Sequence, residues 1–179
     1  IQPFSPKAGT GLSTHELNQP GCYRDVKDTS AIAQFKLVRN KETDFLFNKT
    51  NNDIYCLAWT TTPWTLPSNT ALAVGKKINY LIVETLNQYT GKAITVIVAK
   101  RLFSNYFKSE NAELKFTDYI VGKKNLPFNI IDELKGDELI GLRYEQLLTY
   151  AQPENGDAFK IISADFVTTE DGTGIVHLA

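Results

Sequence analysis

Hydroxyl and aromatic side chains are concentrated in one eleven-residue stretch of the chain. This stretch runs from Trp59 to Asn69, reads WTTTPWTLPSN, and carries five hydroxyls, one amide and two indoles. Pro63 and Pro67 fix φ and remove backbone donors, so the stretch cannot continue as a central strand. Its hydroxyls and remaining N–H groups predict a polar binding loop. The alternative, that the threonines are ordinary strand formers and the indoles ordinary packing residues, stays open.

A second stretch combines two glycines with a lone histidine. Residues 170–177 read EDGTGIVH, a glycine-bracketed turn that leads into an apolar strand carrying His177. Gly172 and Gly174 permit positive φ and a close approach of the backbone to a ligand. His177 is either a ligand contact or a hydrogen-bonded core histidine, and its position leaves both interpretations open. No Ser or Cys stands in a nucleophile-elbow pattern, so the sequence does not predict a hydrolytic triad.

Strands must position both stretches. β-branched and aromatic runs recur along the chain and predict strands at Ala31–Val38, Ile54–Thr61, Tyr80–Leu86, Ile94–Ala99, Ile161–Val167 and Ile175–Leu178. The best helix candidate is 100–108, where four apolar side chains share one face. Within 130–148, Gly136 and Gly141 interrupt a candidate helical turn and favour strand or loop for 136–144. The expected fold class is α+β and strand-dominant, a barrel-like sheet with a few short helices.

The length and composition indicate one domain. The 179 residues are 42% hydrophobic, which is enough to build a core. Residues 1–29 are rich in Pro, Gly, Ser and Thr and predict an irregular or extended segment, followed by a globular body over 30–179. The chain lacks Met and stops within the apolar run 176–179. We therefore expect a single-domain piece of a longer protein.

Charge and cysteine usage narrow the possible partners. With 19 basic and 20 acidic residues the net charge is −1, so any contact with nucleic acid must be local or supplied by a partner. Cys22 and Cys56 stand far apart and the chain has only His15 and His177, which gives no metal-site spacing. We expect no metal and no cofactor. No signal peptide or membrane-length apolar run is present, which predicts a cytoplasmic protein.

Together the two stretches resemble the editing insertion, called CP1, of the isoleucyl-tRNA synthetases, which are class I aminoacyl-tRNA synthetases. In that family a Thr-rich peptide ending in TPWTLPSN faces a GTGxVH strand. Residues 21–28 and 134–144 also look like that family, so the resemblance covers nearly the whole chain, with 89–129 the least diagnostic part. Related valyl and leucyl enzymes carry Arg in the third position of the Thr-rich peptide, where this chain has Thr62. That difference favours the isoleucyl branch.

The resemblance implies an ester hydrolase that removes valine from the transfer RNA for isoleucine, with valyl-adenylate as a further substrate. The family pattern implies catalytic roles for Thr60, Thr61 and Asn69, and substrate contacts by Thr62, Trp59, Trp64 and His177. His177 would limit the size of the amino-acid side chain. The implied partners are the acceptor end of tRNA(Ile) carrying valine and the rest of the parent synthetase, with no membrane and a monomeric state.

A second hypothesis stays open beside hydrolysis. In the family pattern the strand at 175–178 continues to an Asp that anchors the substrate's α-ammonium group, and this chain ends before it. The chain could then be a non-catalytic module that binds the aminoacyl-adenosine end of tRNA. The missing triad does not decide between the two, because an activated ester needs only a positioned water and stabilisation of the oxyanion. An unrelated small-molecule-binding barrel is a third hypothesis.

Overall fold

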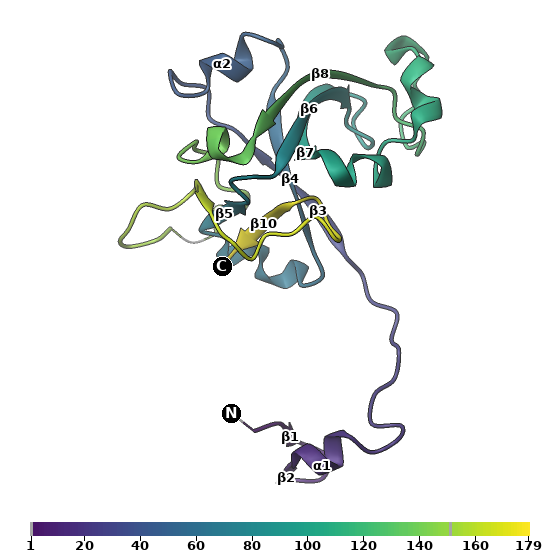
Figure 1. Cartoon of the computed structure of the whole chain (residues 1–179), viewed down its shortest axis with the longest axis vertical. Helices are drawn as coiled ribbons and strands as arrows, with labels where there is room; N and C mark the ends of the chain where they lie inside the picture. The colour runs from purple at the N-terminus through teal and green to yellow at the C-terminus, as the bar shows by residue number, and fades with distance from the viewer. Residues whose placement is uncertain (1, 151) are drawn as a thin grey trace.

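Two sheets form the body of the molecule (Figure 1). We describe residues 2–150 and 152–179 from a computed structural model. The larger sheet has the strand order β3-β4-β7-β6-β8, in which β4 and β7 run parallel and the other neighbours antiparallel. Its strands are β3 (Ala31–Lys36), β4 (Ile54–Thr60), β7 (Ala93–Ala99), β6 (Asn79–Leu86) and β8 (Phe128–Lys135).

The smaller sheet has β5 at its centre. β5 pairs antiparallel with β10 and parallel with β9, in the order β10-β5-β9. The strands are β5 (Ala71–Val74), β9 (Lys160–Ser163) and β10 (Ile175–Leu178). The antiparallel register places His177 opposite Leu72. The C-terminal strand therefore lies beside the chain that leaves the Thr-rich stretch.

Short contacts join the two sheets without closing them into a barrel. Two isolated bridges, Leu37 with Tyr144 and Arg143 with Lys160, connect the edge of β3 to β9. At the opposite end, the N–H of Ala99 in β7 donates to the carbonyl oxygen of residue 173, just before β10. The expected strand-dominant α+β class is confirmed. Within the described residues the barrel-like arrangement is an open one.

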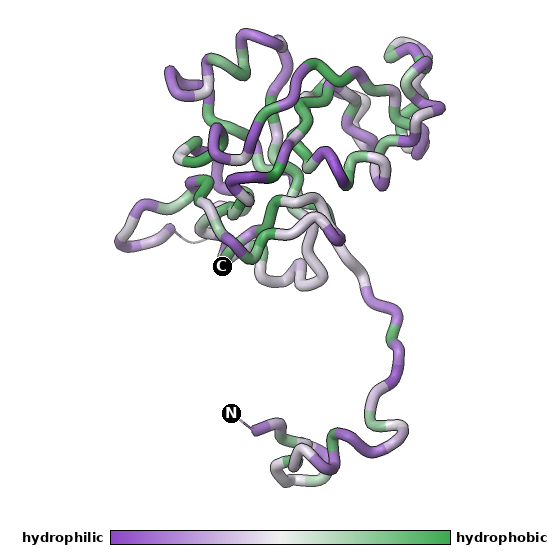
Figure 2. Tube along the Cα trace, in the orientation of Figure 1, coloured by the Kyte–Doolittle hydropathy of each residue, from purple (hydrophilic) through white to green (hydrophobic). Residues whose placement is uncertain are grey.

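The main core lies between the two sheets. It includes Phe35 and Ile97 from the larger sheet and Leu72, Ile161 and Ile175 from the smaller one, all with 0–1% exposure. Side chains alternate across a strand, and alternate residues of β4 therefore enter a second apolar cluster on the outer face of the larger sheet. Figure 2 shows the strands of the body as mostly hydrophobic.

Five of the six expected strands lie close to their observed limits, and one needs correction. The strand expected at 161–167 ends at Ser163. β5 was not predicted, because its four residues follow directly on a proline-rich turn. β8 was not predicted either, because Asn129, Asp132 and Glu133 give it no apolar alternation. As an edge strand it leaves one row of backbone N–H and C=O groups unpaired, and charged side chains there disfavour pairing with another chain.

The helical parts are short. Two α-helical turns are α1 (Thr14–Leu17) and α2 (Asp44–Phe47), and five 3-10 turns are η1 (Pro63–Ser68), η2 (Lys100–Asn105), η3 (Ser109–Glu113), η4 (Phe116–Asp118) and η5 (Gly136–Leu139). The helix expected at 100–108 is therefore the shorter η2. The preference for strand or loop at 136–144 was wrong at its start, where η5 forms. No helix in the described ranges is both long enough and apolar enough to cross a membrane.

The N-terminal segment forms its own small unit. A hairpin of β1 (Phe4–Ser5) and β2 (Thr10–Gly11) precedes α1, which Ser13 caps through a reciprocal pair of hydrogen bonds with Glu16. Figure 1 shows an extended stretch leading from this unit to β3, and Figure 2 shows that stretch as largely hydrophilic.

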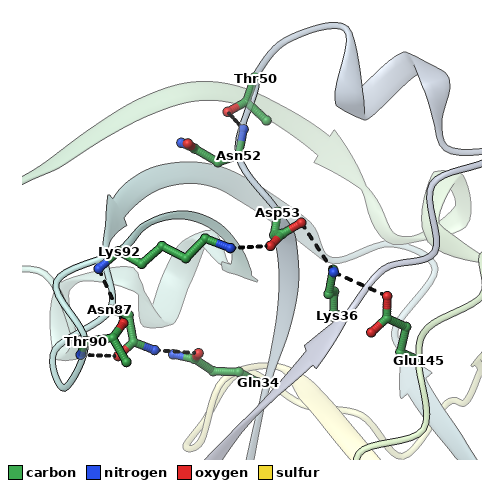
Figure 3. A network of polar contacts seen from close by, with 9 residues as sticks. All are labelled: Gln34, Lys36, Thr50, Asn52, Asp53, Asn87, Thr90, Lys92 and Glu145. Carbon is green, nitrogen blue, oxygen red and sulfur yellow. Dashed lines mark hydrogen bonds and ion pairs between the residues drawn. The ribbon is translucent and has the colours of Figure 1, made fainter.

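A polar network ties the loops at one side of the larger sheet (Figure 3). Lys36 lies 3.4 Å from Asp53 and 3.3 Å from Glu145, and Lys92 lies 2.8 Å from Asp53. The hydrogen bond from Lys92 lowers the pKa of the Asp53 carboxyl below its ordinary value. These groups are partly exposed, so the network sets the position of the loops more than it stabilises the fold.

The contact between η5 and the turn before β6 gives a test of the fold. Gly136 donates its N–H to Ile78, and a Cβ added at Gly136 would lie 2.1 Å from the carbonyl oxygen of Gly75. We expect Gly136→Ala to destabilise the protein by about 2 kcal/mol or more, and to lower Tm by about 5 °C or more. Gly11→Ala is the control, because its Cβ would meet only the flexible side chain of Gln2. Equal Tm values for both variants would contradict this packing.

Candidate functional site

One cavity of about 340 Å³ brings the two predicted stretches together. Its walls come from residues 59–62 at the end of β4, from Phe166 and Thr168, and from residues 171–177 at the start of β10. Of the sequence-predicted site residues, it therefore gathers Trp59, Thr60, Thr61, Thr62 and His177. A larger groove of about 1010 Å³ on the outer face of the larger sheet shares only Trp59 with that set.

The threonines form the wall at the end of β4. Thr60 is the last residue of the strand and is buried, and its hydroxyl accepts the N–H of Thr62 at 3.0 Å. This bond closes a tight turn just before Pro63, where the ring prevents further strand pairing. Thr61 and Thr62 are exposed. Their hydroxyls are thus the accessible ones, while Thr60 shapes the turn.

His177 forms the opposite wall and is held by Thr65. The Thr65 hydroxyl lies 2.7 Å from the carbonyl oxygen of Thr62 and 3.1 Å from His177 Nε2. The Thr65 hydroxyl has one proton, which it donates in the shorter bond, to the carbonyl oxygen of Thr62. Thr65 therefore accepts a hydrogen bond from His177 Nε2. The network thereby assigns the Nε2–H tautomer to His177. The other ring nitrogen, Nδ1, is buried without a hydrogen-bond partner.

Burial keeps the His177 side chain neutral. It lowers the pKa of the imidazole below its ordinary value, because the charged form loses its contact with water. A proton on Nδ1 would also have no acceptor. At neutral pH the wall is therefore an uncharged, rigid ring.

The glycine-bracketed turn completes the cavity. Thr173, 1% exposed, accepts the N–H of Trp59 at 3.2 Å through its hydroxyl and donates to the carbonyl oxygen of Ile175. Gly172 has a φ of 69° and lies against the Trp59 ring, where an added Cβ would be 3.1 Å from a ring carbon. The turn is thus fixed to the end of β4. Trp59 serves as packing for it.

Asn69 and Trp64 lie outside the cavity lining. Asn69 is 4% exposed, and its amide nitrogen donates to the carbonyl oxygens of Ala71 at 2.9 Å and Leu178 at 3.2 Å. Its oxygen accepts the Tyr144 hydroxyl at 2.7 Å. The side chain therefore ties β5 to β10. Trp64 is 67% exposed on η1.

Sequence reasoning missed several residues of the site. Thr65 holds His177 without lining the cavity, and although it belongs to the Thr-rich stretch, its contact with His177 spans 112 positions. Thr173, in the middle of the glycine turn, was not singled out, and Phe166 and Thr168 gave no signal. In the described part of the chain no cluster of three or more His, Cys, Asp or Glu residues could hold a metal ion.

Sequence comparison shows which known proteins the chain is related to. An isoleucine–tRNA ligase from Bacteroides fragilis is 58% identical over 179 residues, which is 100% of this chain and 15% of the relative. The chain belongs to the isoleucine–tRNA ligase family. It spans about 15% of the length of that relative and so corresponds to one segment of such a ligase. No family model matches the chain.

Solved structures support the fold of this ligase segment. The crystal structure of GlLeuRS-CP1 matches with a TM-score of 0.59 over 83% of this chain and 54% of that chain. The editing domain of the cytosolic leucyl-tRNA synthetase of P. knowlesi matches with a TM-score of 0.58 over 83% of this chain and 57% of that chain. Both are 18% identical, so the shared feature is the fold. The expected editing-domain fold is confirmed.

The half-buried imidazole of His177 predicts a specific titration. In a His15→Asn background, which leaves one histidine, we expect the NMR titration of His177 to have its midpoint below about 6.5, the unperturbed value. The unfolded chain then has the higher pKa at His177, so it binds a proton first as the pH falls. The free energy of unfolding should therefore decrease as the pH falls from about 6.5 to the pKa of His177 in the folded protein. Ring ¹⁵N shifts should show the Nε2–H tautomer. A midpoint at or above the unperturbed value would contradict the buried, partner-free Nδ1.

Proposed function

We propose that the cavity hydrolyses the ester bond of a mischarged transfer RNA, namely valine on tRNA(Ile), with valyl-adenylate as a second substrate. One observation carries the proposal: in a chain of the isoleucine–tRNA ligase family, the threonines 60–62 and His177 line one cavity. An aminoacyl ester is already activated. Its hydrolysis needs a positioned water and a stabilised oxyanion, and no protein nucleophile.

The threonine wall orients the reacting groups. Thr61 and Thr62 present their hydroxyls to the ester and to the attacking water, while Thr60 holds the turn in place through its bond to the Thr62 N–H. The ribose hydroxyl next to the ester, on the terminal adenosine, assists the proton transfer. The threonine wall thus contributes to catalysis by placing the reacting groups. Thr60 contributes indirectly, because it sets the shape of the loop.

His177 sets the size limit. Valine is one methylene smaller than isoleucine, and forcing an extra methylene into a packed site costs about 1–3 kcal/mol. A rigid, neutral ring held by Thr65 is suited to exclude the larger side chain. The isoleucyl enzymes are a standard example of a hydrolytic second site that removes a smaller amino acid. This size selection is therefore known from other proteins and does not follow from the present structure.

The remaining predicted residues take supporting roles. Asn69 positions β10, and with it His177, through its bonds to Ala71 and Leu178. Trp64 is an exposed indole beside the threonine wall and contacts the part of the substrate outside the cavity. The partners are the acceptor end of tRNA(Ile) and the rest of the synthetase, acting in the cytoplasm as a monomer without a cofactor.

One observation favours binding without turnover as a second candidate. Among the described residues that line the cavity, Asp171 is the one carboxylate, and it is exposed. The α-ammonium group of the substrate then depends on an acidic residue supplied by another part of the ligase. Binding of a non-hydrolysable valyl-adenosine analogue by the 179-residue chain, without deacylation of Val-tRNA(Ile), would favour this candidate.

The threonine wall gives a test of hydrolysis. In the full-length ligase we expect Thr60→Ala to slow deacylation of Val-tRNA(Ile) by about 10- to 100-fold, because the loop loses the bond that places it. Mischarged product should accumulate in an aminoacylation assay with valine. Thr70→Ala is the control, since Thr70 is exposed and lies outside the cavity. Unchanged deacylation in the Thr60 variant would count against the proposal.

The size limit is tested at His177. His177→Ala removes the ring, so the cavity should accept isoleucine and hydrolyse cognate Ile-tRNA(Ile) about tenfold faster or more, in line with release of about 1–3 kcal/mol of overpacking. The measurement is the deacylation rate of Ile-tRNA(Ile) beside that of Val-tRNA(Ile). His15→Ala, in the N-terminal unit, serves as the control. If the cognate product stays protected, His177 does not set the size limit.

A further inference from the structure

The carbonyl groups of the turn at residues 172–174 all face the body of the protein. In chain order their oxygens accept the hydroxyl of Tyr106 at 2.6 Å, the N–H of Ala99 at 2.9 Å and the hydroxyl of Tyr80 at 2.7 Å. The three donors come from the end of η2, the end of β7 and the start of β6. Each peptide of the turn is therefore fixed in orientation by a different element of the body.

The N–H groups of the same peptides must point the other way. In a trans peptide the carbonyl and the following N–H are opposed, and no peptide in the described ranges is cis. With the carbonyls of residues 172 and 173 held by the body, the N–H groups of Thr173 and Gly174 are turned from it. Neither N–H donates a hydrogen bond to any residue within 2–150 and 152–179. Both residues are buried.

Two N–H groups on buried residues without a protein acceptor are unusual. Nearly all buried backbone donors have a partner, and an unpaired one costs free energy comparable to a lost hydrogen bond. Thr173 and Gly174 line the cavity opposite the threonines 60–62. An oxygen atom of a bound molecule would satisfy both donors.

From this geometry we infer that the N–H groups of Thr173 and Gly174 bind the carbonyl oxygen of the ester and stabilise the negative charge that develops on it. The inference rests on the proposed hydrolysis and adds its oxyanion-binding pair. Its ligand class is an acyl ester, or a tetrahedral anion that imitates the attacked ester. Paired backbone donors of this kind act strongly where water is excluded.

The chemical step balances without a further reactant. The oxygen of water forms a bond to the ester carbonyl carbon, and the π electron pair moves to the carbonyl oxygen between the two N–H groups. When the tetrahedral intermediate collapses, that pair re-forms the double bond and the bond to the ribose oxygen breaks. The ribose oxygen receives one proton from the attacking water. The products are free valine and the tRNA hydroxyl.

The glycines allow the turn to present consecutive donors. Gly172 and Gly174 have φ of 69° and 73°, and alternation of this kind gathers neighbouring N–H groups into an anion-binding concavity. A Cβ on Gly174 would lie 2.4 Å from that of Ala99. Burial raises the pKa of Tyr80 to about 12 and raises the pKa of Tyr106. Both hydroxyls thus keep the protons that hold the carbonyls.

Amide-to-ester replacement tests the pair directly, because it removes one backbone N–H and keeps the side chain. We expect replacement at Thr173 or Gly174 in the full-length ligase to lower kcat for deacylation of Val-tRNA(Ile) about 10²-fold, with KM little changed. The matched control is the same replacement at Thr169, a threonine of the same loop outside the cavity lining. Equal kcat values at all three positions, with deacylation proceeding, would overturn the inference and leave the proposed hydrolysis standing.

Tyr106 is a positioning residue in this scheme and offers an independent test. Tyr106→Phe frees the Gly172 carbonyl, so kcat should fall severalfold while KM stays nearly constant. Tyr119→Phe is the control, because its hydroxyl also donates to a backbone carbonyl, that of Lys123 at 2.8 Å, away from the turn.

In the 179-residue chain, a valyl-adenosine phosphonate should shift the amide proton signals of Thr173 and Gly174 downfield. Binding without those shifts would overturn the inference, and no deacylation by the unmodified ligase would overturn it together with the proposed function.

Discussion

The cavity depends on one buried side-chain amide, that of Asn69. Its nitrogen donates to the carbonyl oxygens of Ala71 and Leu178, and its oxygen accepts the hydroxyl of Tyr144. These bonds fix the end of β10 against the start of β5, directly beside His177. They act together with the bonds between Thr65 and His177 and between Trp59 and Thr173, which join the two walls directly. A side chain that does not line the cavity thus helps to fix the position of one of its walls.

The amide is in turn coupled to the core. Tyr144 is 2% exposed, and its ring packs edge-on against Phe35 at a centroid distance of 5.3 Å. Burial raises the pKa of Tyr144 above its ordinary value, so its hydroxyl is a permanent donor. Loss of either partner would leave the other buried and unpaired, at a cost of about 1–3 kcal/mol. Core packing and site geometry therefore share the same contacts.

Much of the fold could be predicted from local sequence, but the contacts that bring the two stretches of the site together could not. β-branched runs predict most of the strands, and the glycine-bracketed turn predicts a close approach of the backbone. The contact of Thr65 with His177 spans 112 positions, and no periodicity carries information over that range. The expectation that the two stretches face each other came from the family resemblance. The bonds of Asn69 to Leu178 and Tyr144 could not be predicted from local sequence, because these partners lie 109 and 75 positions away.

The cavity is built from dipoles more than from charges. Its histidine is neutral, its threonines are uncharged, and its described lining includes the single exposed carboxylate of Asp171. Fixed dipoles act on a developing charge only if they do not have to reorient during the reaction. The structure meets this condition by holding the turn at 172–174 from three sides and His177 through Thr65. A site of this kind gains little affinity from long-range attraction to RNA, and a chain with a net charge of −1 supplies little more. Under the proposed hydrolysis, affinity for the tRNA therefore comes largely from outside this segment, and the cavity acts on the ester alone.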